Sequence, residues 1–170
     1  MSNKIYPIGI QNFEKLRLGG YFYIDKTALI YKMVKTGSYY FLSRPRRFGK
    51  SLLISTLEAY FQGKKELFEG LAMEKLETEW RRHPILHMDL NIGKYDTPDS
   101  LDRILNKALT DWEAIYGTGA AETTLALRFA GIIKRAYEQT GERVVILVDE
   151  YDKPMLQAIN NEALQAHFRD

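Results

Sequence analysis

The sequence predicts an α/β fold in which helices flank a mostly parallel sheet. Two short apolar runs, residues 39–42 and 144–148, support this prediction, and a polar, charged segment directly follows each of them. The second run has five consecutive apolar residues, four of them β-branched, which is typical of a strand buried on both faces of a parallel sheet. Segments with apolar residues at helical spacing lie between the runs, and this alternation favours parallel strands.

A candidate phosphate-binding loop follows the first run. Residues 43–51 read SRPRRFGKS, and Gly49, Lys50 and Ser51 match the end of the Walker A pattern G-x-x-x-x-G-K-[ST]. Gly49 permits a tight turn, and a helix that starts here offers free amides and a positive dipole end to an anion. We therefore expect Lys50 to bind the β- and γ-phosphates and the Ser51 hydroxyl to bind Mg²⁺. Because Arg44 replaces the first glycine, a basic turn before an ordinary helix start is the alternative.

A candidate Walker B pair follows the second run. Asp149 and Glu150 come directly after it, at the end of the strand where open α/β sheets bind their ligands. The pattern predicts that Asp149 holds Mg²⁺, directly or through water, and that Glu150 orients an attacking water as the catalytic residue. The alternative is that both are the solvated end of a strand. Together the two motifs predict a three-layer αβα fold like that of P-loop NTPases.

Three segments resemble one family. The sequences YIDKT (residues 23–27), RPRRFGKSL (44–52) and VDEYD (148–152) are similar to the AAA-ATPase-like family of bacterial proteins, whose loop usually reads R-P-R-R-F-G-K-[ST]. The resemblance covers nearly all 170 residues and implies an ATP-binding module of an AAA-type ATPase, with ATP and Mg²⁺ as cofactors. The nucleotide-binding positions it implies are Arg46, Arg47, Phe48, Gly49, Lys50, Ser51 and Leu52. For Arg46 and Arg47, a phosphate contact and a place in the basic wall of the loop are both open.

The resemblance also implies an incomplete domain. We expect one domain over residues 1–170, with residues 1–37 as an extension beside the nucleotide site. In related ATPases a sensor strand usually follows the Walker B strand and lies between it and the P-loop strand. About twenty residues follow Glu150 here, without an obvious strand, so we expect a sheet that is incomplete at its C-terminal end. Hydrolysis to ADP and phosphate would then require completion of the domain, and the trailing helix is a candidate for self-association.

Spacing and cap residues predict the other elements. We expect strands over residues 39–42, 84–90 and 144–148. In the first half of the chain we expect a short helix at 13–16, a helix from the cap Asp25 to Gly37, a helix that follows the loop and ends at Gly63, and surface turns over 64–82. In the second half we expect a helix from Thr97 to Gly117, a helix over 123–140 and a helical tail. Residues 25–27 are either a plain helix start or a segment over the nucleotide. Asp89 ends a strand and ranks below Asp149 as a site residue, and His87 is expected in the core.

Composition limits the other functions. The net charge of +2 is too small to indicate nucleic acid by itself, and the absence of cysteine excludes disulfides and thiolate metal sites. No apolar run approaches the ~20 residues of a membrane span, so we expect a cytoplasmic protein. Family members often carry a PD-(D/E)XK nuclease-like domain, which makes such a domain, or DNA, an expected partner. The alternatives are a small P-loop kinase, for which residues 151–170 supply only Arg169 as a lid arginine, and a nucleic-acid-binding module that uses the basic loop.

Overall fold

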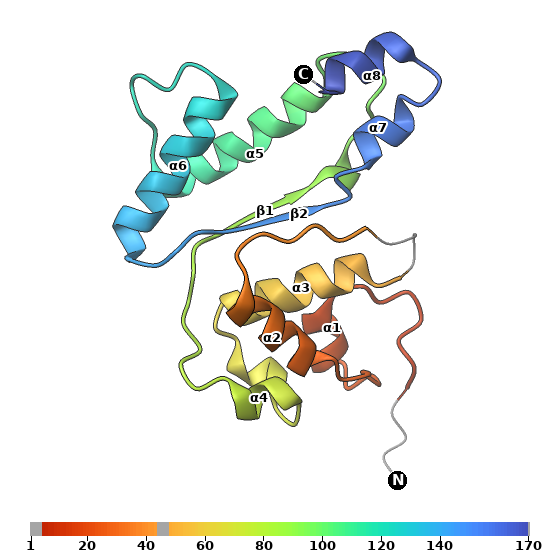
Figure 1. Ribbon diagram of the computed structural model, residues 1–170, viewed down its shortest axis with the longest axis vertical. Coiled ribbons are helices and arrows are strands. Elements are labelled where there is room, and N and C mark those ends of the chain that lie inside the picture. The colour runs from red at the N-terminus through yellow and green to blue at the C-terminus, as the bar shows by residue number, and fades with distance from the viewer. Residues whose placement is uncertain (1–4, 44–47, 170) are drawn as a thin grey trace. The chain divides into compact units, whose positions relative to one another are not determined.

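The chain forms two compact units, residues 1–83 and residues 84–170, in a computed structural model that describes residues 5–43 and 48–169. The first unit is helical among its described residues, and the second contains a small parallel sheet (Figure 1). The predicted α/β class with parallel strands is confirmed. Each unit has its own buried residues and is described by itself below.

The first unit packs short helices around an aromatic centre. Its elements are α1 (Phe13–Leu18), α2 (Thr27–Thr36), α3 (Lys50–Phe61), the 3₁₀ turn η1 (Lys65–Phe68) and α4 (Ala72–Leu76). The rings of Phe13 and Phe68 lie 4.9 Å apart between centroids, and both side chains are fully buried. Residues 64–82 form the expected short turns, but the prediction that they lie on the surface is wrong, since Leu67, Phe68 and Met73 belong to the core. Leu71 is buried as well, and the many charged residues around these four apolar side chains explain why the sequence indicated a surface segment.

The apolar run before the phosphate loop is not a strand. Residues 39–42 have no regular secondary structure, and the side chains of Tyr39 and Phe41 are 96% and 76% exposed. A strand requires a neighbour for its backbone hydrogen bonds, and no strand among the described residues pairs with this segment. The predicted strand here is therefore wrong, because apolar composition alone does not supply the neighbour.

The second unit is built on two parallel strands. Its elements are β1 (Ile85–Asp89), the 3₁₀ turn η2 (Leu90–Ile92), α5 (Ser100–Tyr116), α6 (Leu125–Thr140), β2 (Val145–Asp149), α7 (Lys153–Gln157) and α8 (Glu162–Arg169). The strands pair in register from Ile85 opposite Val145 to Asp89 opposite Asp149. Leu86 of β1 packs with α5 and α6 in a core that also contains Leu109, Trp112 and Ile132. In Figure 1 the two strands run side by side, and α5 and α6 pack against each other on one side of them.

β2 is less buried than its sequence predicts. Ile146 and Val148 are 45% and 39% exposed, so the expectation of a strand buried on both faces is wrong. Among the described residues β2 has one neighbouring strand, and its second edge is unpaired. Ile146 and Val148 alternate with the buried Leu147 and Asp149, so one face of the strand is buried and the other is exposed.

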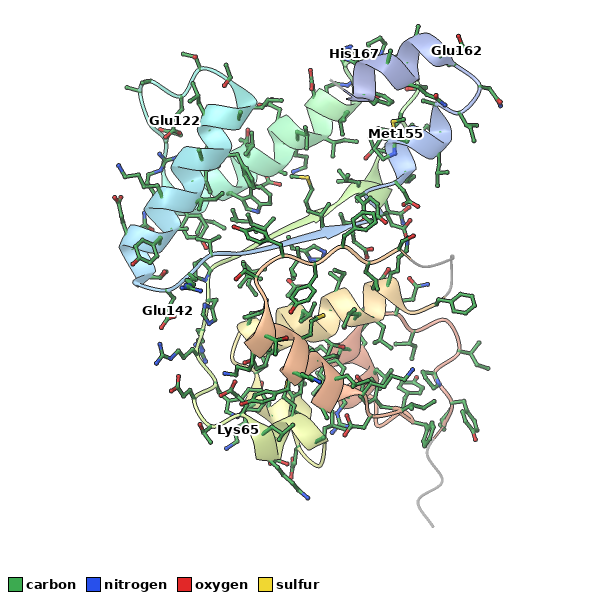
Figure 2. The ribbon with its side chains drawn as sticks, in the orientation of Figure 1. Lys65, Glu122, Glu142, Met155, Glu162 and His167 are labelled. Atoms are coloured by element: carbon green, nitrogen blue, oxygen red, sulfur yellow. The ribbon has the colours of Figure 1, made fainter. Side chains whose placement is uncertain are left out.

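Polar contacts fix the helix ends and the turn between α5 and α6. Thr124 caps α6, because its hydroxyl accepts a hydrogen bond from the Leu127 amide. α5 begins at Ser100 instead of Thr97, since Thr97 forms a turn whose carbonyl accepts from Ser100. Glu122, labelled in Figure 2, pairs with Arg135 of α6 and holds the connecting loop against that helix. Within the described part of the chain, no helix has the length and apolarity needed to cross a membrane.

Candidate functional site

The first group of predicted site residues lies at the start of α3. Gly49 directly precedes the helix with φ of 77°, in the left-handed region where glycine is strongly favoured. A Cβ at this position would meet no atom within 4 Å. The requirement for glycine is therefore conformational: it turns the chain so that α3 can begin at Lys50.

This helix start has the features of an anion site. No side chain of the described residues caps it, and its first turn contains no acidic residue. Lys50, Ser51 and Leu52 form the first turn and are half-buried, whereas the Phe48 ring is 65% exposed. Arg46 and Arg47, predicted as part of the same loop, lie outside the described residues. The structure thus places Gly49, Lys50 and Ser51 at the beginning of a twelve-residue helix, as the motif predicts.

The body of α3 is anchored by α1 and by its own core residues. The Ser55 hydroxyl accepts a hydrogen bond of 2.9 Å from the Phe13 amide and donates to the Leu52 carbonyl. Leu57 and Tyr60 face the core, as their spacing predicts. The segment that contains α1 therefore packs on α3. That this segment lies beside a bound nucleotide stays a prediction.

Asp25 and Thr27 join two helix starts. One carboxylate oxygen of Asp25 accepts from the amide and hydroxyl of Thr27, at the start of α2, and the other accepts a 2.7 Å hydrogen bond from the Ala72 amide, at the start of α4. The Thr27 hydroxyl in turn accepts from the Met73 amide. Partial burial would raise the pKa of Asp25, but these hydrogen bonds outweigh it and hold the pKa below its usual range. The contacts favour the helix-start reading of residues 25–27.

Glu77 is a buried carboxylate that the sequence did not reveal. It is 5% exposed, and one oxygen accepts from the Tyr60 hydroxyl and pairs with Lys35 at 2.8 Å. Its other oxygen accepts from the amides of Thr78 and Glu79. Burial alone would raise the pKa of Glu77, but Lys35 and the hydrogen bonds lower it to about 2. A cavity of about 50 Å³ beside this cluster is too small for a nucleotide, since ligand pockets usually exceed about 300 Å³.

The second group of predicted site residues lies at the carboxyl end of the sheet. Asp149 is the last residue of β2 and is only 8% exposed, and its Oδ1 accepts a 2.9 Å hydrogen bond from the Glu150 amide. Glu150 follows with φ of 53°, a left-handed conformation that is uncommon for a residue with a side chain. Backbone strain of this kind often occurs at functional positions. β1 ends beside it at Asp89, which the register pairs with Asp149.

Two side chains connect the segments that follow β1 and β2. The Lys153 ammonium, at the start of α7, donates to the backbone and side-chain oxygens of Asn91 in η2. The Gln157 side chain accepts a 2.8 Å hydrogen bond from the Tyr95 amide. These contacts keep the two strand ends together without using Asp149 or Glu150.

The residues present are compatible with Mg²⁺. Among the described residues, no group of three or more His, Asp or Glu is gathered as a metal centre. Mg²⁺ is usually bound by one or two carboxylates together with substrate phosphates and waters, so such a group is not required. Asp149 supplies a carboxylate whose Oδ2 has no hydrogen-bond partner in the described part of the chain. Ser51 supplies a hydroxyl in the first turn of α3.

The predicted site residues thus form two groups. Gly49, Lys50, Ser51 and Leu52 come together in the first unit, and Asp149 and Glu150 in the second. The sequence did not reveal two residues that join helices of the first unit: Glu77, in a stretch assigned to the surface, and Thr27, whose partner Met73 is 46 residues away. A buried glutamate has no local sequence signal. Asp25 was predicted as the cap of α2, but the cap residue is Lys26, and Asp25 instead accepts from Thr27, the first residue of the helix.

Comparisons with known proteins agree with these motifs. A family model described as AAA-ATPase_like, "Predicted AAA-ATPase", matches residues 7–170. A protein of Azotobacter chroococcum mcd 1, named "Uncharacterized protein in vnfD 5′ region", is 41% identical over 171 residues, which cover all of this chain and 33% of that protein. The chain therefore spans about a third of the length of this curated relative. No solved structure matches the chain. The match over residues 7–170 shows that the chain belongs to the AAA-ATPase-like family.

Proposed function

We propose that the chain is a Mg²⁺-dependent ATP-binding module of a P-loop ATPase. In this proposal Lys50 binds the β- and γ-phosphates, while the backbone amides at the start of α3 hold the phosphate chain. Ser51 and Asp149 hold the Mg²⁺ ion, and Glu150 orients the attacking water. The proposal requires the three-layer αβα fold of P-loop NTPases, which is more specific than the α/β class.

One observation carries the proposal. The left-handed Gly49 leads directly into α3, so that Lys50 and Ser51 occupy the first helical turn, next to amides that no side chain of the described residues caps. A helix start combines free amides with the positive end of the helix dipole, and a phosphate group satisfies both. The family match supports this reading, because its description names an ATPase.

Each group of residues has a separate chemical task. When bound, Mg²⁺ would neutralise charge on the phosphate oxygens. Lys50 is placed to do the same from the helix start, and it cannot accept a proton from water while it is charged. Glu150, at the end of β2, carries the carboxylate that can accept such a proton. In this proposal the phosphate contacts come from the first unit, and the Mg²⁺ on which binding depends is held by residues of both units. Hydrolysis to ADP and phosphate depends in addition on Glu150 of the second unit.

The activity of a longer protein is a further proposal. The curated relative is about three times as long as this chain, so segments outside residues 1–170 can supply a sensor residue, an arginine finger or a nuclease-like domain. DNA as a partner, self-association and a cytoplasmic location also stay predictions.

Calorimetric titration tests nucleotide binding. The wild type is titrated with a non-hydrolysable ATP analogue, with and without Mg²⁺, beside Lys50→Ala and the matched control Lys65→Ala, which changes an exposed lysine of η1. We expect Mg²⁺-dependent binding that weakens about 100-fold in Lys50→Ala, since several charge-assisted hydrogen bonds are lost. Lys65→Ala should bind like the wild type. Equal affinity in wild type and Lys50→Ala would refute the P-loop assignment.

A second measurement tests the role of Glu150. In a preparation that hydrolyses ATP, Glu150→Gln should keep the wild-type affinity for ATP and lose more than about tenfold in turnover, as removal of a positioned base does. Turnover that survives this change would remove Glu150 from the mechanism. Binding of duplex DNA with steep salt dependence, without any preference for nucleotide, would favour the nucleic-acid alternative instead.

A further inference from the structure

We infer that Asp89 is a second carboxylate of the magnesium site and acts beside Asp149 as a positioning residue. The inference rests on the proposed function, and it adds an outer-shell carboxylate that neither the Walker pattern nor the family description assigns. In this arrangement Asp149 binds the cation directly. Asp89 holds it through a bound water from the neighbouring strand.

The register of the sheet places the two side chains together. Asp89 and Asp149 are Cα partners at the last pair of the β1–β2 ladder. Neighbouring strands lie about 4.8 Å apart, and paired residues of a parallel ladder point to the same face of the sheet. The two carboxylates therefore stand next to each other on one face, at the carboxyl end of both strands.

Their hydrogen bonds leave one oxygen of each carboxylate for a cation. Oδ1 of Asp89 accepts from the Asn91 amide at 2.8 Å, and Oδ1 of Asp149 accepts from the Glu150 amide at 2.9 Å. In the described part of the chain, neither Oδ2 has a hydrogen-bond partner, and no ion pair reaches either carboxylate. The nearby ammonium of Lys153 is directed to Asn91 instead. Each carboxylate is thus held in place by one oxygen, and the other is available.

The burial of Asp149 favours the binding of a cation beside its carboxylate. Asp149 is 92% buried, and like charges directly opposite each other on a sheet are destabilising. A buried carboxylate with an available oxygen and an acidic neighbour is the environment in which a divalent ion is favourable. Asp89 is exposed, so it can keep a water between its carboxylate and the ion, which suits the reluctance of Mg²⁺ to lose its waters.

Mn²⁺ serves as a spectroscopic probe for this site. Free Mn²⁺ is measured by electron paramagnetic resonance during titration of the wild type, Asp89→Asn, Asp149→Asn and the control Asp111→Asn, which changes an exposed aspartate of α5. Titrations are made without nucleotide and again with a saturating non-hydrolysable ATP analogue. Circular dichroism checks that each nearly isosteric variant is folded, and Asp89→Glu tests rescue by a retained carboxylate.

We expect Asp89→Asn to weaken Mn²⁺ binding about tenfold, because outer-shell partners typically contribute 10- to 100-fold in metal affinity. Asp149→Asn should lose more, Asp89→Glu should recover part of the loss, and Asp111→Asn should match the wild type. Wild-type Mn²⁺ affinity in a folded Asp89→Asn would overturn the inference, as would a wild type that binds no Mn²⁺ in either titration. Mn²⁺ binding that depends on Asp89 in a protein that binds no nucleotide would leave the carboxylate pair in place and contradict the proposed function instead.

Discussion

The two groups of predicted site residues, one in each unit, are held in different ways. Asp149 and Glu150 follow a strand that is paired in register with β1, and β1 rests on the apolar core of the second unit. Lys50 and Ser51 follow an apolar run of similar composition that has no strand partner among the described residues. Their position depends on α3, and in the first unit polar contacts at Ser55, Asp25 and Glu77 hold the helices together. Similar apolar runs therefore have different structural roles, depending on whether a neighbouring strand is present.

The largest expected effect comes from the core beneath β1. Leu86→Ala removes a fully buried side chain and should lower the free energy of unfolding of the second unit by about 2–5 kcal/mol. Phe41→Ala, within residues 39–42, should change it by no more than about 0.5 kcal/mol, because that ring is mostly exposed. Urea denaturation followed by circular dichroism measures both. Equal losses in the two variants would show that residues 39–42 are as firmly packed as β1.

Replacement of Glu77 should have the next largest effect on the free energy of unfolding, and this effect should depend on pH. The pKa of about 2 in the folded chain lies below the usual value of 4.5, so the stabilisation is complete above about pH 4.5 and is lost as the pH falls toward 2. The contribution is about 2–3 kcal/mol. Glu77→Gln should be less stable at pH 7 by about this amount. Its unfolding free energy should also depend less steeply on pH between about 4.5 and 2, and parallel pH curves for the two proteins would contradict the assignment.

The hydrogen bonds of Asp25 should contribute less to stability than those of Glu77. Asp25→Ala removes acceptors from the starts of α2 and α4 and should cost about 1–2 kcal/mol, as lost helix caps do. Its nucleotide affinity should equal that of the wild type at a temperature where both are folded. Reduced affinity in a folded Asp25→Ala, with unchanged thermal stability, would favour the alternative that this segment lies over the nucleotide.

The smallest effect concerns the backbone at Glu150. Its φ of 53° is costly for most side chains, so Glu150→Gly should stabilise the chain by about 0.5–1 kcal/mol. Asn tolerates this conformation better than Glu does, and Glu150→Asn should therefore lie between the two. Thermal unfolding of the three proteins provides the test. A glycine variant less stable than the wild type would mean that the Glu150 side chain contributes more than its conformation costs.

Local signals predicted much of this architecture. The helices α5 and α6 have long periodic apolar faces, and both were expected, although α5 begins three residues later than its Thr97 signal. The strands β1 and β2 were placed within one residue at each end. The failure at residues 39–42 has a physical cause, since a strand exists only with a neighbour and the sequence does not specify which segment provides it.

The site was predictable where its residues are adjacent in sequence. Gly49, Lys50 and Ser51 lie at a helix start because a glycine with positive φ and the helix after it are local features. The pairing of Asp89 with Asp149 depends on strand register across sixty residues, and the contact of Thr27 with Met73 joins two helices. Such long-range contacts follow from the packed structure and are not specified by any short motif.

Amide hydrogen exchange gives the most direct test that the start of α3 binds phosphate. Exchange at Phe48, Lys50 and Ser51 is compared in the free chain, with Mg²⁺ alone, and with Mg²⁺ and a non-hydrolysable ATP analogue. We predict that exchange at these amides slows only when nucleotide is present, because the phosphates would accept hydrogen bonds from them. In Lys50→Ala we predict no such slowing. Unchanged exchange at these amides under saturating analogue, in a folded chain, would contradict the account.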